Sequence, residues 1–205
     1  MSVTEQKKGG EAGLRTENLT LNMGPSHPAM HGTVRMELSL DGETVVDADI
    51  NVGYLHRGFE KMCEAGTWTK VIPYTDRLNY VSPLINNVGY VMAVEKLLGV
   101  EITERCKYVR VLISEISRIT DHLTAIGASA LELGAFTPFL YTMQAREEFY
   151  FLIEELTGAR VTTNFTRIGG LRRDLTENFR ERYFYCEERL LKLLDDIDKR
   201  LTKNR

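Results

Sequence analysis

Two histidines in a short loop rich in glycine and proline are the first residues whose type and spacing suggest chemistry. Residues 24–32 read GPSHPAMHG and contain His27 and His31. Glycine and proline restrict the backbone, and side chains held on a rigid loop are often functional. Histidines four residues apart bind a metal ion when they share one face of a helix. Pro28 argues against a helix and no third ligand is evident, so metal binding is the weaker interpretation and a purely structural loop stays open.

Two further segments combine ionisable and aromatic side chains without helical or strand periodicity. Residues 54–61 read YLHRGFEK, and residues 74–80 read YTDRLNY. They are either functional loops or ordinary surface turns and helix caps, with Asp76 and Arg77 as a solvated ion pair. The pattern alone does not separate these alternatives. His122 lies in a segment with helical periodicity, where a lone histidine is more often structural.

The composition excludes several classes of protein and site. Cys63, Cys106 and Cys186 are far apart and form no CxxC pair, which predicts reduced thiols and indicates no cysteine-based metal site. A net charge of -3 gives no reason to expect nucleic acid as a partner. The chain has no apolar run long enough to span a membrane, and its polar N-terminus does not resemble a secretory signal. We therefore expect a cytoplasmic protein.

Alternating residues in the first third of the chain predict the element that holds the histidine loop. Apolar and polar residues alternate over three runs, residues 19–23, 34–40 and 45–52. Asp41-Gly42 between the last two runs is a strong hairpin signal. We therefore expect a small antiparallel β unit over residues 18–57. Residues 1–17 contain almost no apolar side chains and are predicted to form a flexible tail.

From about residue 58 onward, apolar residues recur at the three- and four-residue spacing of helices. Four long helices are predicted, over residues 80–98, 103–128, 137–156 and 176–202. Thr137-Pro138 is a suitable N-cap and first turn for the third helix. The predicted fold class is α+β, a small antiparallel β unit followed by a helical bundle over residues 58–205. The apolar positions of the last helix need a partner surface, either the preceding helices or another part of a longer protein.

Five motifs in the chain resemble the D subunit of the proton-pumping NADH–quinone oxidoreductases, which are known as complex I. They are GPSHPAMHG, GYLHRGFEK, YTDRLNY, SEISRITDHL and the stretch from LELGAFTPF to RIGGLRRDL. They occur in the order and spacing of that family, and the similarity covers about residues 18–180. Members of the family are about twice this length, so the resemblance implies that the chain is a truncated form, the N-terminal half.

The resemblance implies roles for individual residues at a quinone site. His31 and Tyr80 match the histidine and tyrosine that hydrogen-bond the two quinone carbonyls, and His27 belongs to the same binding loop. Reduction of a quinone by two electrons needs two protons, which an imidazole and a phenol are suited to deliver. Glu132 stands where an aspartate usually pairs with this histidine, and its longer side chain changes the reach of the carboxylate.

Two further positions bear on the terminal iron–sulfur cluster, which a sister subunit holds in this family. Arg77 matches an arginine near that cluster, where a cation favours the reduced state. Thr162 stands where the family often has a histidine. Because threonine cannot be protonated, we expect a cluster potential that is lower and less dependent on pH. A lower-potential donor suits menaquinone rather than ubiquinone, and neutral drift at Thr162 is the alternative.

The function implied by the resemblance is transfer of electrons from the terminal cluster to quinone inside a proton-translocating respiratory enzyme. The electrons come from NADH through flavin and iron–sulfur centres on other subunits, so we expect no flavin, cluster or nickel on this chain itself. Expected partners are the subunit that holds the terminal cluster, the C subunit of the same complex and the membrane subunit with the quinone channel. The expected location is peripheral, on the cytoplasmic side of the inner membrane.

Two other functions stay open. The large subunits of nickel–iron hydrogenases are similar to this family, but they hold their metals with CxxC pairs. One such pair falls on Asn79 and Ser82 here, and neither side chain replaces a thiolate at such a centre. The other alternative is a non-catalytic fragment that only assembles with partners. The presence of both His31 and Tyr80 argues against it.

Overall fold

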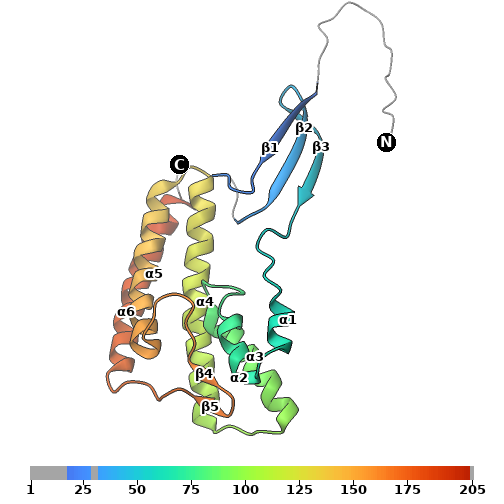
Figure 1. Cartoon of the computed structure of the whole chain (residues 1–205). Coiled ribbons are helices and arrows are strands. Elements are labelled where there is room, and N and C mark those ends of the chain that lie inside the picture. Colours follow the sequence, from blue (N-terminus) through green and yellow to red (C-terminus); the bar gives the residue numbers. More distant parts are fainter. Residues whose placement is uncertain (1–17, 29–31, 204–205) are drawn as a thin grey trace, which may run out of the picture. The chain divides into compact units, whose positions relative to one another are not determined.

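The computed structural model describes residues 18–28 and 32–203, and the chain divides into two compact units between Arg57 and Gly58. In the described part, the first unit holds an antiparallel sheet and the second holds the helices (Figure 1). This confirms the predicted α+β fold class. Residues 1–17, the predicted tail, lie outside the described residues.

The sheet of the first unit has the order β1-β2-β3. Its strands are β1 (Leu19–Met23), β2 (Arg35–Asp41) and β3 (Thr44–Asn51). Asp41 pairs with Thr44 across the tight turn, in which Gly42 has a φ of 63°. Glycine adopts this left-handed conformation without steric cost, so the hairpin predicted at Asp41-Gly42 is confirmed.

The histidine loop begins directly after β1 and depends on a glycine. Gly24 has a φ of 95°, and a Cβ atom at this position would overlap the backbone carbonyl of Val34. The start of the loop therefore packs tightly against the residue that precedes β2. Any larger residue at position 24 would force the two ends of the loop apart.

The second unit contains six helices and one short hairpin among the described residues. They are α1 (Phe59–Glu64), α2 (Trp68–Thr75), α3 (Pro83–Leu98), α4 (Glu104–Glu132), α5 (Phe136–Thr157), β4 (Thr166–Arg167), β5 (Gly170–Leu171) and α6 (Phe179–Arg200). Several predicted helix boundaries are wrong. The second long helix, α4, ends at Glu132 rather than at residue 128, and the last, α6, begins at Phe179 rather than at residue 176. The third long helix has its N-cap at Ala135 rather than Thr137, and α3 begins at Pro83, which leaves Tyr80 in the turn before it.

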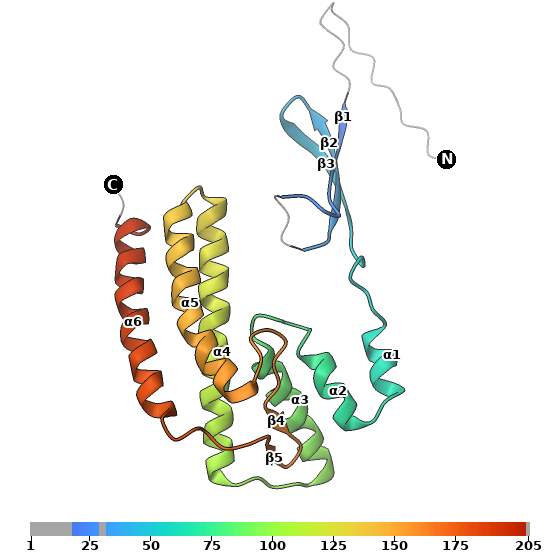
Figure 2. The same ribbon diagram turned by 60° about the vertical axis from the view of Figure 1, so that its left-hand side comes forward.

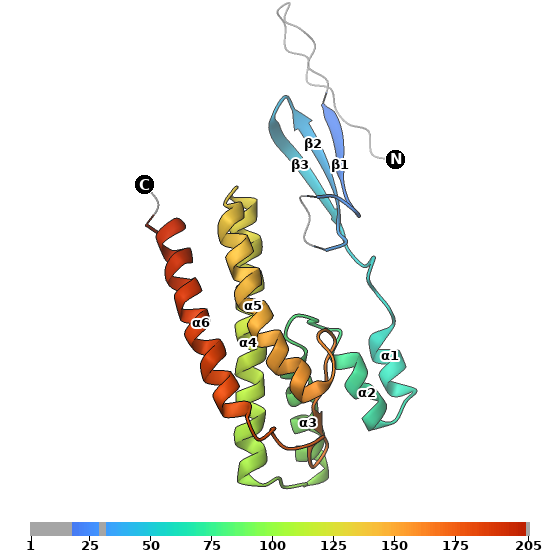
Figure 3. The same ribbon diagram turned by 90° about the vertical axis from the view of Figure 1, so that its left-hand side faces the viewer.

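The long helices pack through apolar stripes, with α5 between α4 and α6 (Figure 2). The core combines side chains of all three helices, including Ile113, Phe149 and Leu190. The helix α3 packs on α4, and the β4–β5 hairpin contacts α3 (Figure 3). Gly127 permits the close approach of α4 and α5, because a Cβ atom there would overlap the Thr142 side chain.

Only one face of the last helix, α6, packs against another described element of this chain. Leu190 and Ile197 are buried, and α5 is the element against which α6 packs. Phe184, Tyr185 and Leu191 remain exposed on the same helix. The preceding helices therefore cover one face of α6 and leave apolar side chains on another.

Candidate functional site

The predicted site residues are distributed over both units. His27 is half-buried in the loop after β1, and His31 lies outside the described residues. Arg77 and Tyr80 lie together in the turn between α2 and α3. Glu132 is the exposed last residue of α4, twelve residues or about 18 Å of helix beyond Thr120, which contacts that turn. The structure thus brings Arg77 and Tyr80 onto one segment and places Glu132 well along α4.

Asp76 and Arg77 are not a solvated pair, and that interpretation of the sequence is wrong. Asp76 is fully buried, whereas Arg77 is about half exposed. The Arg77 guanidinium lies 3.7 Å from Asp76 Oδ2 and donates a hydrogen bond of 2.5 Å to the backbone carbonyl of Pro73. A cation is therefore held at the surface directly above a buried carboxylate.

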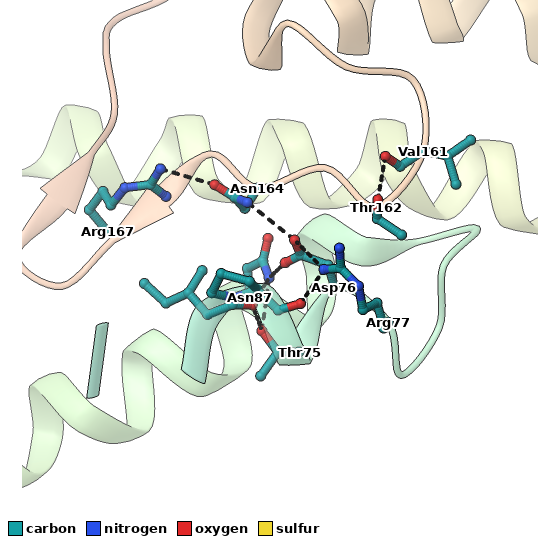
Figure 4. A network of polar contacts seen from close by, with 10 residues as sticks. Thr75, Asp76, Arg77, Asn87, Val161, Thr162, Asn164 and Arg167 are labelled. Atoms are coloured by element: carbon teal, nitrogen blue, oxygen red, sulfur yellow. Dashed lines mark hydrogen bonds and ion pairs between the residues drawn. The ribbon is translucent and has the colours of Figure 1, made fainter. Parts of the chain in front are cut away.

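Two asparagines hold the buried carboxylate from different elements (Figure 4). Asn87 of α3 donates to Asp76 Oδ1 at 2.5 Å and to Thr75 Oγ1 at 2.9 Å. Asn164, in the segment before β4, donates to Asp76 Oδ2 at 3.1 Å and accepts a hydrogen bond of 2.9 Å from Arg167. The end of α2, helix α3 and the β4 segment are therefore joined at one carboxylate.

The electrostatic state of Asp76 reflects opposing effects. Burial raises the pKa of the Asp76 carboxyl above its ordinary value, because the charged form loses water. The hydrogen bonds from Asn87 and Asn164 and the charge of Arg77 act in the opposite direction and lower that pKa. Burial of a charged carboxylate without such donors would cost far more free energy of folding.

Tyr80 presents its side chain to the surrounding space rather than to the core. The residue is 64% exposed, three positions after Arg77 on the same turn. A phenol in this position is accessible to a ligand and, as a hydroxyl group, both donates and accepts hydrogen bonds. The turn therefore combines a fixed cation with an accessible proton donor.

Thr162 lies on the segment that reaches Asp76, two residues before Asn164 (Figure 4). Its φ is 51°, and its hydroxyl donates a hydrogen bond of 2.8 Å to the backbone carbonyl of Val161. A positive φ is unusual for a β-branched residue and costs roughly 1–3 kcal/mol in strain. The position thus suits glycine, asparagine or histidine better than threonine.

A buried ion pair fixes the hairpin that follows this segment. Arg110 of α4 makes two hydrogen bonds of 2.7 Å and 2.6 Å to the carboxylate of Glu95 on α3. Arg110 also donates to the backbone carbonyls of Arg167 and Gly170, each at 3.1 Å, and Glu95 accepts from the backbone of Gly169 at 2.7 Å. Hydrogen bonds from Arg110 are the main cause of a lowered pKa at Glu95.

Sequence reasoning missed Asn87, Asn164, Glu95 and Arg110. The sequence does contain a signal for the burial of Glu95 and Arg110, because each of these charged residues falls on the apolar stripe of its helix. Glu95 follows Val91 by four residues, and Arg110 precedes Ile113 by three. Charged residues at such positions are rarely buried unless they are paired. No comparable pattern distinguishes the two asparagines.

The positions that a hydrogenase would occupy with cysteines form a different contact. Asn79 Nδ2 donates a hydrogen bond of 2.7 Å to Ser82 Oγ, a pairing of amide and hydroxyl rather than of thiolates. Within residues 18–28 and 32–203, no group of three or more His, Cys, Asp or Glu side chains is arranged to hold a metal ion. In the same part of the chain, none of the helices is both long enough and apolar enough to cross a membrane.

Known proteins resemble the chain over almost all of its length. One D subunit of the NADH-quinone oxidoreductase of Sorangium cellulosum (strain So ce56) is 57% identical over 95% of this chain and 48% of the relative. The NADH-quinone oxidoreductase D subunit of Myxococcus xanthus (strain DK1622) is 53% identical over 95% of this chain and 47% of the relative. The corresponding D subunit of Methylacidiphilum infernorum (isolate V4) is 52% identical over 92% of this chain and 45% of the relative.

A family model points to the same group. Residues 132–205 match the model described as the respiratory-chain NADH dehydrogenase, 49 Kd subunit. The chain spans about half the length of the curated relatives it matches. Over the half that it spans, the chain belongs to the family of D subunits of the NADH-quinone oxidoreductases.

Proposed function

We propose that this chain forms the quinone-binding part of a proton-translocating NADH:quinone oxidoreductase. Its role is to bind quinone while electrons arrive from the terminal iron–sulfur cluster of a neighbouring subunit. The identity of 57% to a relative named as a D subunit of NADH-quinone oxidoreductase is the observation that carries this proposal. Two geometric observations also support this proposal, the exposed phenol of Tyr80 and the fixed cation of Arg77.

The proposed chemistry is the reduction of a quinone to a quinol with two electrons and two protons. Tyr80 donates a proton to one carbonyl oxygen and His31 to the other, with His27 on the same loop as part of the quinone site. Both donors regain their protons from water or from neighbouring acids. An imidazole and a phenol are suited to this role because each donates a hydrogen bond to the carbonyl before the electrons arrive. We assign Glu132 to the same site as the acid that pairs with His31.

Arg77 contributes electrostatically in this proposal. Its guanidinium is permanently charged, and its contacts with Pro73 and Asp76 limit its movement. A fixed cation near the terminal cluster stabilises the state that carries the extra electron. The cluster itself belongs to the partner subunit and supplies the electrons.

The partners in this proposal are the other subunits of complex I. They are the subunit that holds the terminal cluster, the C subunit and the membrane subunit that contains the quinone channel. The chain then lies peripherally on the cytoplasmic side of the membrane. Menaquinone is the proposed acceptor, because Thr162 lacks the titratable group that would raise the cluster potential.

Substitution of Tyr80 by phenylalanine tests the proposed function. The change removes one hydroxyl and keeps the ring, so we expect quinone reduction in the purified complex to fall by about 100-fold or more. Electron transfer from NADH to ferricyanide, which bypasses the quinone site, is expected to stay unchanged. His31→Ala is expected to behave in the same way.

A matched control for this substitution is Tyr108→Phe. Tyr108 is a tyrosine of α4 that is 73% exposed, similar to Tyr80, and we expect its variant to reduce quinone normally. Normal quinone turnover by the Tyr80→Phe complex would contradict the assignment of Tyr80 as a proton donor.

A further inference from the structure

The exposed Tyr80 lies between two residues that are tied to the middle of α4. On one side, Asn79 Nδ2 donates a hydrogen bond of 3.3 Å to Asp121 Oδ2. On the other side, the backbone carbonyl of Val81 accepts a hydrogen bond of 3.2 Å from Thr120 Oγ1. Thr120 and Asp121 are adjacent on α4, so one turn of a long helix holds both neighbours of Tyr80.

The turn around Tyr80 is also closed on itself. Asn79 Oδ1 accepts a hydrogen bond of 3.3 Å from the backbone of Val81, and the backbone carbonyl of Asn79 accepts one of 3.2 Å from the backbone of Ser82. Ser82 is buried at the start of α3 and receives the second hydrogen bond of the Asn79 amide, at 2.7 Å. The backbone on both sides of Tyr80 therefore has little freedom, although the tyrosine side chain is exposed.

Thr120 is the buried anchor of this arrangement. The residue is 0% exposed, and its hydroxyl, which has a single proton to share, lies within hydrogen-bond distance of two backbone carbonyls, Val81 at 3.2 Å and Ser117 of its own helix at 2.7 Å. The bond within the helix is ordinary for threonine, but the bond to Val81 joins residues 39 positions apart. Loss of the hydroxyl would leave a carbonyl of the tyrosine turn without this partner.

A proton donor must lie within hydrogen-bond reach of the group it protonates, and a displacement of about 1 Å can cost on the order of 100-fold in rate. An exposed side chain on an irregular turn is the kind of group that loses such alignment most easily. Anchoring the turn to a rigid helix preserves the alignment of the side chain before the ligand binds.

We infer that Thr120, together with Asn79 and Asp121, is a positioning residue that sets the location of the Tyr80 phenol for quinone reduction. The inference rests on the proposed function of Tyr80. It assigns part of the SEISRITDHL motif on α4 to the alignment of the proton donor. Thr120 does not itself touch the quinone in this scheme.

The test is Thr120→Val in the purified complex, which removes the hydroxyl and preserves the shape of the side chain. We expect the rate of quinone reduction to fall roughly tenfold, with ferricyanide reduction unchanged. Thr142→Val is the matched control. Thr142 is also 0% exposed and donates to the carbonyl three residues earlier in its own helix, at 2.7 Å to Phe139, but it lies on α5. We expect normal quinone reduction from that control.

Two more variants separate positioning from general damage. Thr120→Ser keeps the hydroxyl and is expected to restore the rate, and Thr120→Val is expected to add no further loss when Tyr80 is already phenylalanine. The inference is overturned if Thr120→Val has normal activity while Tyr80→Phe is slow. It is also overturned if both valine variants are equally slow, or if the loss persists in the Tyr80→Phe background.

The half-buried Asp121 provides a second route if the Thr120→Val complex does not assemble. Asp121→Ala is expected to slow quinone reduction, and to have no effect when Tyr80 is phenylalanine. An unchanged rate in Asp121→Ala would then overturn the inference. Normal quinone reduction by Tyr80→Phe is a distinct result, because it contradicts the proposed function itself.

Discussion

At the scale of single residues, Thr162 combines an unfavourable backbone with a position next to the proposed electron path. Its φ of 51° favours residues such as histidine, asparagine and glycine. Threonine at this point has no titratable side chain, and its hydroxyl is engaged with its own neighbour, Val161. The chain thus tolerates strain at a position two residues from Asn164, which contacts Asp76.

A redox titration of the terminal cluster in the complex, at several pH values, tests the role of Thr162. We expect a low potential with little dependence on pH in the native complex. Thr162→His is expected to raise the potential and to introduce pH dependence, because an imidazolium forms beside the reduced cluster. A shift of one kcal/mol for one electron corresponds to roughly 40 mV.

Thr162→Asn is the control for this titration, since asparagine tolerates the positive φ and does not titrate. We expect it to change stability without changing the pH dependence. A native potential that already falls by about 60 mV per pH unit would show that proton coupling survives without histidine. The proposal that menaquinone is the acceptor would then be withdrawn.

At the scale of elements, the pair of Glu95 and Arg110 joins α3, α4 and the β4–β5 hairpin. The hairpin has only two short strands and cannot be stable alone. Its turn is held by the Glu95 carboxylate through Gly169 and by the Arg110 guanidinium through Arg167 and Gly170. The ion pair therefore also fixes the segment that brings Asn164 to Asp76.

Glu95→Gln is expected to loosen this hairpin. Breaking one partner of a buried pair leaves the other charge uncompensated and costs about 3–5 kcal/mol. We expect faster hydrogen exchange of the backbone amides in residues 166–171. Glu104→Gln, which removes an exposed carboxylate paired with Lys107, is the control and should leave that exchange unchanged.

The same pair predicts a pH dependence of hairpin protection. The folded-state pKa of Glu95 is lowered, so its stabilisation is complete above the unfolded pKa and is lost as the pH falls through the folded one. Protection of the native hairpin should therefore decline in acid, below the ordinary range of glutamate. In Glu95→Gln the corresponding acid-dependent loss should be missing, and its persistence would contradict this role for the pair.

At the scale of the whole molecule, each unit leaves apolar side chains on its surface. Val45, Val46 and Ile50 are exposed on β3, and Phe184 and Leu191 are exposed on α6. A contiguous apolar surface of several hundred square ångströms promotes association. We expect the exposed side of α6 to contribute most to association, because its apolar residues recur along one helix.

We expect the purified chain to associate rather than to remain a monomer, and light scattering measures this directly. Leu191→Lys is expected to reduce association by placing a charge on the exposed side of α6. Leu97→Lys is the control and should have less effect, although this leucine near the end of α3 is 72% exposed compared with 61% for Leu191. A monodisperse monomer of the unmodified chain would contradict the prediction.

Features that depend on near neighbours in the chain follow from the sequence pattern alone. Alternating residues predicted the strands, Asp41-Gly42 predicted the hairpin, and the three- and four-residue spacing predicted the long helices. The pattern of residues 74–80 did not separate a functional segment from a surface turn, and only the family resemblance favoured a functional segment. The short helices α1 and α2 and the β4–β5 hairpin escaped prediction. Helices of six and eight residues span only about two turns, too few for the helical period to repeat, and strands of two residues show no alternation.

Which distant residues meet at the candidate site became evident from the folded structure. Asn164 reaches Asp76 across 88 positions, and Thr120 reaches the carbonyl of Val81 across 39. Such contacts depend on how the helices pack, and a polar residue has the same identity in the sequence whether it is buried or exposed. Burial turned Asp76 from an expected surface charge into the carboxylate that joins the end of α2 to two other elements. The cost of removing it from water is offset by donors from α3 and from the segment before β4.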